Sequence, residues 1–343
     1  MLTKRLEVFS RDLPAFRSIL IGCDPEFLLV GEGDLLLNAA EYIGAEAGAE
    51  FGVDGASFPA ELRPAPSSSP AHVVRRLAEL LKHESGDVQQ FEWWVGNGHP
   101  LHTVGGHIHI SMDSDVRGRI CSPDARWDAL LEALDALLVP FAICLSEPRH
   151  FDRRKGTYGT LKAYRETSRY VGIEYRTLPS WLYDPQVALF FMQGAKAITM
   201  ALGSGNLDWL GLVRDVGIIA PVLYGGFTDV SSATLKEALK ERIGVYAAAM
   251  RDLAYMKPTY AEDALQHVLE LIARGVVWDA VDVRENWLNV TIATLPRGEP
   301  RPLPVLSFFD CSTIDPRLLQ PGSYVIWPPS AATVNLHGEY LHV

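Results

Sequence analysis

Stretches of apolar residues bounded by turn-forming residues dominate the first half of the chain. They predict strands at residues 21–30, 57–65, 91–98, 103–112 and 171–181. Successive strand side chains point to opposite faces, so most of these stretches place polar residues on one face and apolar residues on the other. An antiparallel sheet with one face packed on helices has this pattern. We therefore expect an antiparallel sheet with a polar face.

Apolar residues at helical spacing fill much of the remaining chain. They predict helices at residues 71–84, 124–145, 185–202, 233–254 and 261–274, which makes the segment 185–290 mostly helical. Between the strands, residues 153–170 form a polar, basic, glycine-containing stretch that we expect to be a loop. The fold class predicted is α+β, with one domain over residues 1–290 and a Pro-rich, β-like extension over residues 291–343.

Composition narrows the classes of function. Of the 343 residues, 48% are hydrophobic and 21% are charged, which is enough apolar material for a sizeable core. The net charge of −11 argues against a general binder of nucleic acid or of membrane surfaces. The four cysteines form no CxxC motif, and neither a signal-peptide core nor a membrane-spanning run is present. We therefore expect a cytoplasmic protein, of a bacterium or of a phage-infected host cell, without nucleic-acid or membrane partners.

Four of the strand-like stretches carry a pair of charged or histidine residues two positions apart. These pairs are Asp24 and Glu26, Glu61 and Arg63, His107 and His109, and Glu174 and Arg176. Two positions on a strand share a face, so each pair projects to one side. A face that only contacts water usually carries Lys, Thr and Ser, whereas these residue types bind metal ions or phosphate.

A divalent cation would explain the two acids inside an apolar strand. Adjacent carboxylates on a partly buried strand repel each other unless a positive charge lies between them. A ligand set made mostly of carboxylates with one or two histidines favours Mg²⁺ or Mn²⁺ over Zn²⁺. Asp54, in an Asp-Gly turn seven residues before Glu61, adds a further acid, although Asp-Gly is also an ordinary turn.

The order of these motifs resembles that of a known enzyme superfamily. The segments "GCDPEF", "VDG…AELRP", "GGHIHIS" and "GIEYRTLPSW" resemble, in this order, the carboxylate–amine ligases of the glutamine synthetase and glutamate–cysteine ligase fold. Among these, the chain is most similar to the phage-type amidoligases (COOH–NH2 ligase type 2). The resemblance covers roughly residues 20–185. It implies a curved antiparallel sheet of the glutamine synthetase-like catalytic type, with helices covering the convex face.

The resemblance also implies roles for individual residues. Asp24, His107 and Glu174 match ligands of the metal nearer the ATP phosphates, and Glu26, Asp54 and Glu61 match ligands of the metal nearer the acyl substrate. Arg176 matches the residue that contacts the transferring phosphoryl group, and Arg165 an arginine that grips phosphate or a substrate carboxylate. We further expect His109, Arg63 and Lys162 to bind the nucleotide.

Several of these assignments have a plainer structural alternative. Glu61 and Arg63 form an ion pair if the strand merely pairs its charges, and His109 is then an ordinary buried polar residue. Lys162 and Arg165 belong to a solvated loop unless the sheet holds that loop over the polar face. Trp93 and Trp94 are expected in the core rather than at a substrate platform.

The function expected is that of an ATP-dependent ligase. Such an enzyme joins a carboxylate to an amine through an acyl phosphate, with two divalent metals, Mg²⁺ or Mn²⁺, and small-molecule or peptide substrates. Three alternatives stay open at this point: a guanidino-type phosphotransferase on the same fold, a metal-dependent hydrolase, and a non-catalytic phage structural or assembly protein. The sequence leaves the substrates and the oligomeric state open.

Overall fold

The structure is a computed structural model, in which a large part of the chain can be described. The described residues are 19–43, 49–54, 58–120, 127–148, 159–166, 170–204, 232–256, 258–297 and three short strands near the C-terminus. None of the helices within these residues is long and apolar enough to cross a membrane.

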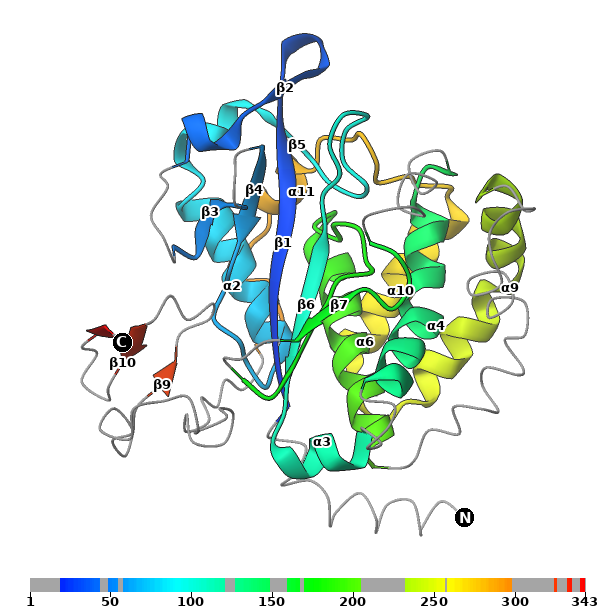
Figure 1. Cartoon of the computed structure of the whole chain (residues 1–343). Coiled ribbons are helices and arrows are strands. Elements are labelled where there is room, and N and C mark those ends of the chain that lie inside the picture. Colours follow the sequence, from blue (N-terminus) through cyan, green and yellow to red (C-terminus); the bar gives the residue numbers. More distant parts are fainter. Residues whose placement is uncertain are drawn as a thin grey trace.

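An antiparallel sheet of eight strands organises the described part of the chain (Figure 1). Its strand order is β3-β4-β1-β6-β8-β7, and β2 and β5 also pair with β1. The strands are β1 (Leu20–Gly31), β2 (Leu35–Leu37), β3 (Phe51–Val53), β4 (Pro59–Leu62), β5 (Glu92–Trp94), β6 (Gly106–Ser111), β7 (Tyr164–Glu166) and β8 (Gly172–Tyr175). The main path begins and ends on different strands, so the sheet is open rather than closed into a barrel.

Helices cover one face of this sheet. The described helices are α2 (Pro70–His83), α3 (Ser114–Ile120), α4 (Asp128–Leu145), α6 (Pro185–Gly203), α9 (Ser232–Asp252), α10 (Thr259–Ala273) and α11 (Arg284–Leu288). Figure 1 shows α2 and α6 behind the sheet, where both pack against β1. Short 3-10 helices lie at Glu32–Asp34, Ala39–Glu41, Gly86–Gln90, Ala254–Met256 and Ile292–Thr294.

The central strand β1 shows how alternation sorts the two faces. Cys23, Phe27 and Leu29 point into the main hydrophobic core, together with apolar residues of α2 and α6. Asp24 and Glu26 lie at the intervening positions and therefore face away from the helices. The predicted division into an apolar and a polar face is confirmed over residues 23–27, whereas Leu28 and Val30, on the same face as the acids, belong to a second apolar cluster with Trp94 and Val104.

Pro25 lies inside this central strand, although proline cannot donate a hydrogen bond to a neighbouring strand. Its position explains why it is tolerated. Residues 20–25 of β1 pair with β6, whereas pairing with β4 begins at Glu26. Pro25 therefore stands just before pairing with β4 begins on one side of the strand, between the two acids of the polar face.

The predicted elements are largely present, with one correction. β1 is slightly longer than its sequence pattern, the other predicted strands are shorter than theirs, and the predicted helices are confirmed within about four residues where they are described. Residues 153–170, predicted to be a loop, contain the strand β7, which pairs with β8 through Arg165 and Glu174. This pairing depends on a partner strand and not on local apolar periodicity, so the sequence pattern did not reveal it.

Within residues 291–343, the structure describes a short 3-10 turn and three short strands. The strands are β9 (Tyr324–Val325), β10 (Ala332–Val334) and β11 (Tyr340–His342), which form a small antiparallel sheet. The division of the chain into a domain and an extension stays a prediction.

Gly106 opens β6 and allows a close approach of two chain segments. A Cβ atom on Gly106 would lie 2.4 Å from the Pro179 carbonyl oxygen and 2.5 Å from the Trp181 ring. The Trp181 indole N–H also donates to the Gly106 carbonyl over 2.8 Å. We expect Gly106→Ala to lower the free energy of unfolding by about 1–3 kcal/mol, as overpacking does.

Denaturant unfolding measures this effect, and Gly244→Ala is a matched control. Gly244 is exposed in α9, and a Cβ atom there would meet nothing within 4 Å. This control is expected to stabilise the protein by roughly 0.5–1 kcal/mol, because alanine favours helix more than glycine does. Equal stability of the two variants would contradict the close approach at Gly106.

Candidate active site

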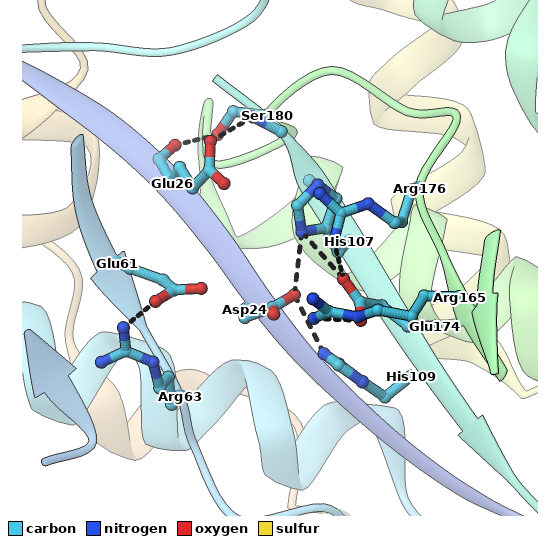
Figure 2. Close-up of polar contacts among 12 residues, drawn as sticks. Asp24, Glu26, Glu61, Arg63, His107, His109, Arg165, Glu174, Arg176 and Ser180 are labelled. Carbon is cyan, nitrogen blue, oxygen red and sulfur yellow. Dashed lines mark hydrogen bonds and ion pairs between the residues drawn. The ribbon is translucent and has the colours of Figure 1, made fainter. Parts of the chain in front are cut away.

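The strand register brings the four polar pairs onto one face of the sheet. Asp24 lies opposite His107, and Glu26 lies opposite Glu61. In the next ladder, His109 lies opposite Glu174. Directly opposed residues of antiparallel strands project to the same side at short range. Residues from β1, β4, β6 and β8 therefore meet in one cluster (Figure 2).

Asp24 is the centre of this cluster. Its Oδ1 atom lies 3.0 Å from His109 Nε2 and 3.4 Å from His107 Nδ1. Burial alone would raise the pKa of Asp24, but the two imidazoles together hold that pKa well below its usual range. For His107, burial lowers the pKa, yet the nearby Asp24 carboxylate raises it above its usual value overall. Asp24 is thus held as a carboxylate.

Glu174 is the second carboxylate of the cluster and binds two arginines. Its side chain is almost fully buried, with 1% exposed. Arg165 donates to its Oε2 atom and Arg176 to its Oε1 atom, each over 2.5 Å. Glu174 Oε1 also lies 3.5 Å from His107 Nδ1. The Arg165 side chain stays 63% exposed, so one guanidinium reaches both the buried acid and solvent.

Glu26 and Glu61 form the other side of the cluster, and burial raises the pKa of both acids. Burial raises the pKa of Glu26 to about 7, although His107 and the Gly105 amide, which donates to Glu26 Oε2 over 2.7 Å, act against this. Burial also raises the pKa of Glu61 to about 9; the negative charge of Asp24 reinforces this shift and the positive charge of Arg63 opposes it. Two buried acids therefore resist ionisation, as expected where a cation would stabilise them.

Three predicted residues lie at the margin of this cluster. Asp54 is exposed after β3, and its charge is near enough to raise the pKa of both Glu26 and Glu61. Arg63 forms an ion pair with Glu61, as expected if the strand merely pairs its charges, and donates to the Val53 carbonyl over 2.6 Å. Lys162 pairs with Glu132 of α4, so its ammonium is tied to a helix. Their roles as metal or nucleotide ligands stay predictions.

The cluster brings ligand atoms close to the separations that a metal ion requires. One atom each from Asp24, His109 and Glu174 lies within 4.8 Å of the others. Two ligands of one Mg²⁺ ion lie at most about 4.2 Å apart, since each stands about 2.1 Å from it. A small inward shift would therefore let these three residues share an ion. His107 faces the same two carboxylates, so either histidine, or both, can complete the set.

Tyr170 belongs to the site but was not among the residues selected from the sequence. Its hydroxyl lies 3.0 Å from His109 Nδ1, and the residue is buried. Nothing in its local pattern indicates this contact, because Tyr170 precedes β8 and reaches its partner on β6 across the sheet. Ser180 was also missed: its hydroxyl donates to the Glu26 carbonyl over 2.5 Å, and its role is to hold β1 (Figure 2).

Residues 21–288 match the family described as phage phiEco32-like COOH.NH2 ligase type 2. The chain belongs to this family. By its description this is a family of carboxylate–amine ligases, as the motif order predicted. The match favours a ligase over the phosphotransferase, the hydrolase and the non-catalytic structural protein.

Comparison with other proteins gives only distant likenesses. No curated protein is significantly similar in sequence to this chain. Among solved structures, a bifunctional glutathione synthetase from Pasteurella multocida matches 83% of the chain at 9% identity, with a TM-score of 0.45. The chain spans 50% of the length of that protein. The second structure is the ligase PafA in complex with the prokaryotic ubiquitin-like protein Pup. The match covers 81% of this chain and 72% of that chain at 10% identity, with a TM-score of 0.42.

Proposed function

We propose that this amidoligase uses ATP to activate a carboxylate as an acyl phosphate and then transfers the acyl group to an amine. The observation that carries the proposal is the buried cluster of Asp24, Glu26, Glu61 and Glu174 beside Arg165 and Arg176. A carboxylate is a poor electrophile, because its charge repels an amine and its oxygen is a poor leaving group. Phosphorylation removes both obstacles.

The residues would divide between two divalent ions. Asp24 and Glu174, with His107 or His109, would hold one ion, and Glu26 and Glu61 the other, with Asp54 near it. Bound Mg²⁺ or Mn²⁺ would neutralise the charge of the ATP phosphates and would relieve the repulsion among the buried acids. The raised pKa values of Glu26 and Glu61 support this, because without a cation Glu61 stays protonated and Glu26 is only partly ionised at neutral pH.

The arginines fit the transfer of a phosphoryl group. In the first step, a carboxylate oxygen attacks the γ-phosphorus and ADP leaves; in the second, the amine nitrogen attacks the acyl carbon, phosphate leaves and a base takes the amine proton. Arg176, partly exposed beside Glu174, would follow the phosphoryl oxygens. Arg165, with its largely exposed guanidinium, would hold a phosphate or the substrate carboxylate.

The finer structural assignment is part of this proposal. The open antiparallel sheet with helices on one face agrees with a curved sheet of the glutamine synthetase-like type, whose polar face would be the concave one. The substrates would be a small-molecule or peptide carboxylate and an amine in the cytoplasm. His109 would bind either the metal or a phosphate, because its Nε2 atom faces Asp24.

Thermal unfolding with a non-hydrolysable ATP analogue tests the proposal without knowledge of the substrates. We expect the analogue to stabilise the protein only when Mg²⁺ or Mn²⁺ is present. At a hundred times the dissociation constant, the stabilisation is about 2.7 kcal/mol. Glu26→Ala and Glu174→Ala are expected to lose this shift, because each removes a carboxylate from one proposed metal site.

Glu32→Ala serves as the control variant, since Glu32 is an exposed acid just after β1. This variant is expected to respond to metal and nucleotide as the wild type does. A shift with zinc alone, and none with any nucleotide, would contradict the ATP-dependent mechanism and favour hydrolysis.

A further inference from the structure

Tyr170 is placed to control one of the candidate metal ligands. Its hydroxyl oxygen lies 3.0 Å from His109 Nδ1, and the other ring nitrogen, Nε2, lies 3.0 Å from Asp24 Oδ1. One imidazole therefore connects a buried tyrosine to the central carboxylate of the cluster. Tyr170 is 4% exposed and meets the His109 ring edge-on, with the ring centroids 6.4 Å apart.

The backbone beside Tyr170 is fixed by the sheet. The Met112 amide, at the end of β6, donates to the Val171 carbonyl over 2.9 Å. Gly172 then pairs with Ser111, and the ladder continues to the pair of His109 and Glu174. The tyrosine is thus anchored to the strand that carries His109, which gives its hydroxyl a defined position relative to the imidazole.

The two nitrogens of His109 need different proton arrangements in the two states of the site. Without a metal, a proton on Nε2 favours its 3.0 Å contact with the Asp24 carboxylate, and Nδ1 then accepts a hydrogen bond. With the Nε2 lone pair on a metal, the proton must be on Nδ1, which then donates. A tyrosine hydroxyl can donate in the first arrangement and accept in the second.

We propose that Tyr170 is a positioning residue, whose hydroxyl orients the His109 ring and satisfies Nδ1 both before and after a divalent metal binds. This inference rests on the proposed metal-dependent function. It adds a residue outside the ligand set and assigns His109 to direct metal contact through Nε2. It also explains why a phenol, rather than a one-way donor or acceptor, stands beside this histidine.

Mn²⁺ binding tests the inference without a substrate. The loss of the free-ion electron paramagnetic resonance signal measures the dissociation constant of Mn²⁺ for the wild type, Tyr170→Phe and the control Tyr164→Phe. Tyr164 is a solvent-accessible tyrosine on β7. We expect Tyr170→Phe to weaken Mn²⁺ binding roughly 10–100-fold, the usual effect of removing a partner of a metal-ligating histidine. Tyr164→Phe is expected to bind as the wild type does.

A double-mutant cycle separates positioning from general support of the fold. In a His109→Ala background, Tyr170→Phe is expected to cause no further loss of Mn²⁺ affinity, because the ring that it orients is gone. A merely structural tyrosine would weaken binding equally in both backgrounds, and this result would overturn the inference. Melting temperatures in EDTA show whether each variant is folded before metal is added.

The remaining outcomes distinguish this inference from the proposed function. If the wild type binds Mn²⁺ and Tyr170→Phe binds it equally well, the role of Tyr170 is overturned while the metal-dependent function stands. If the wild type binds no Mn²⁺, the proposed function itself fails, and the inference fails with it.

Discussion

Glu174→Gln is expected to lower amine-dependent ADP formation by roughly a hundredfold or more. The substitution keeps the shape of the side chain but removes its negative charge. Glu174 binds both Arg165 and Arg176 and is one of the three residues with ligand atoms close enough to share an ion. A neutral amide therefore weakens the proposed metal site and releases the two guanidinium groups at the same time.

The loss should fall mainly on the chemical step. In the proposed mechanism, Arg176 needs a fixed position to stabilise charge that develops on the transferring phosphoryl group, and Arg165 needs one to hold a phosphate or the substrate carboxylate; Glu174 supplies both. We therefore expect the turnover rate to fall more than the apparent affinity for ATP, measured as ADP release over a panel of carboxylates and amines.

Glu32→Gln makes the same chemical change at an exposed position and is expected to retain wild-type turnover. Circular dichroism of both variants verifies that they are folded at the assay temperature. Turnover of Glu174→Gln within threefold of the wild type would exclude a central role for this carboxylate.

The stability of the metal-free protein is expected to decrease between about pH 5 and pH 8. Glu26 and Glu61 have ordinary pKa values of 4.5, which burial raises to about 7 and about 9 in the folded chain. Each acid holds a proton in the folded chain at a pH where the unfolded chain has lost it. Folding then takes up protons, so stability falls as pH rises from 4.5 toward the folded value.

The expected loss is large for a single site. One pKa unit corresponds to about 1.4 kcal/mol, so Glu26 alone contributes about 3 kcal/mol over this range. His107 acts in the same direction, because the nearby Asp24 raises its pKa overall despite burial. Its favourable ion pair is present at low pH and is lost as pH rises through the folded value.

Urea unfolding in EDTA at a series of pH values measures this slope. Glu61→Gln and Glu26→Gln should each flatten it and stabilise the metal-free protein at the alkaline end. Glu41→Gln, at an exposed acid, should leave the slope unchanged. Saturating Mg²⁺ or Mn²⁺ should also flatten the slope, because a cation replaces the missing protons. Wild-type stability that rises over the same interval would contradict the raised pKa values.

The sequence by itself determined which residues share a face. An alternation with period two places Asp24 and Glu26 on one side of a strand. It likewise places His107 and His109 on one side of their strand, and Glu174 on the polar side of its own. Strand geometry forces this result wherever the strand forms. The order of the motifs then sufficed to predict the family of carboxylate–amine ligases, and the family match confirms this membership.

Only the tertiary structure decided which of these side chains meet. The register opposes Asp24 to His107 and Glu26 to Glu61, and no local pattern specifies a register between strands far apart in sequence. The structure also contains the strand β7 within a predicted loop, and it pairs Lys162 with Glu132 of α4. Tyr170 was invisible to periodicity, because its contact with His109 arises from pairing between β6 and β8. Local sequence fixes the direction of each side chain, whereas long-range strand pairing fixes its neighbours.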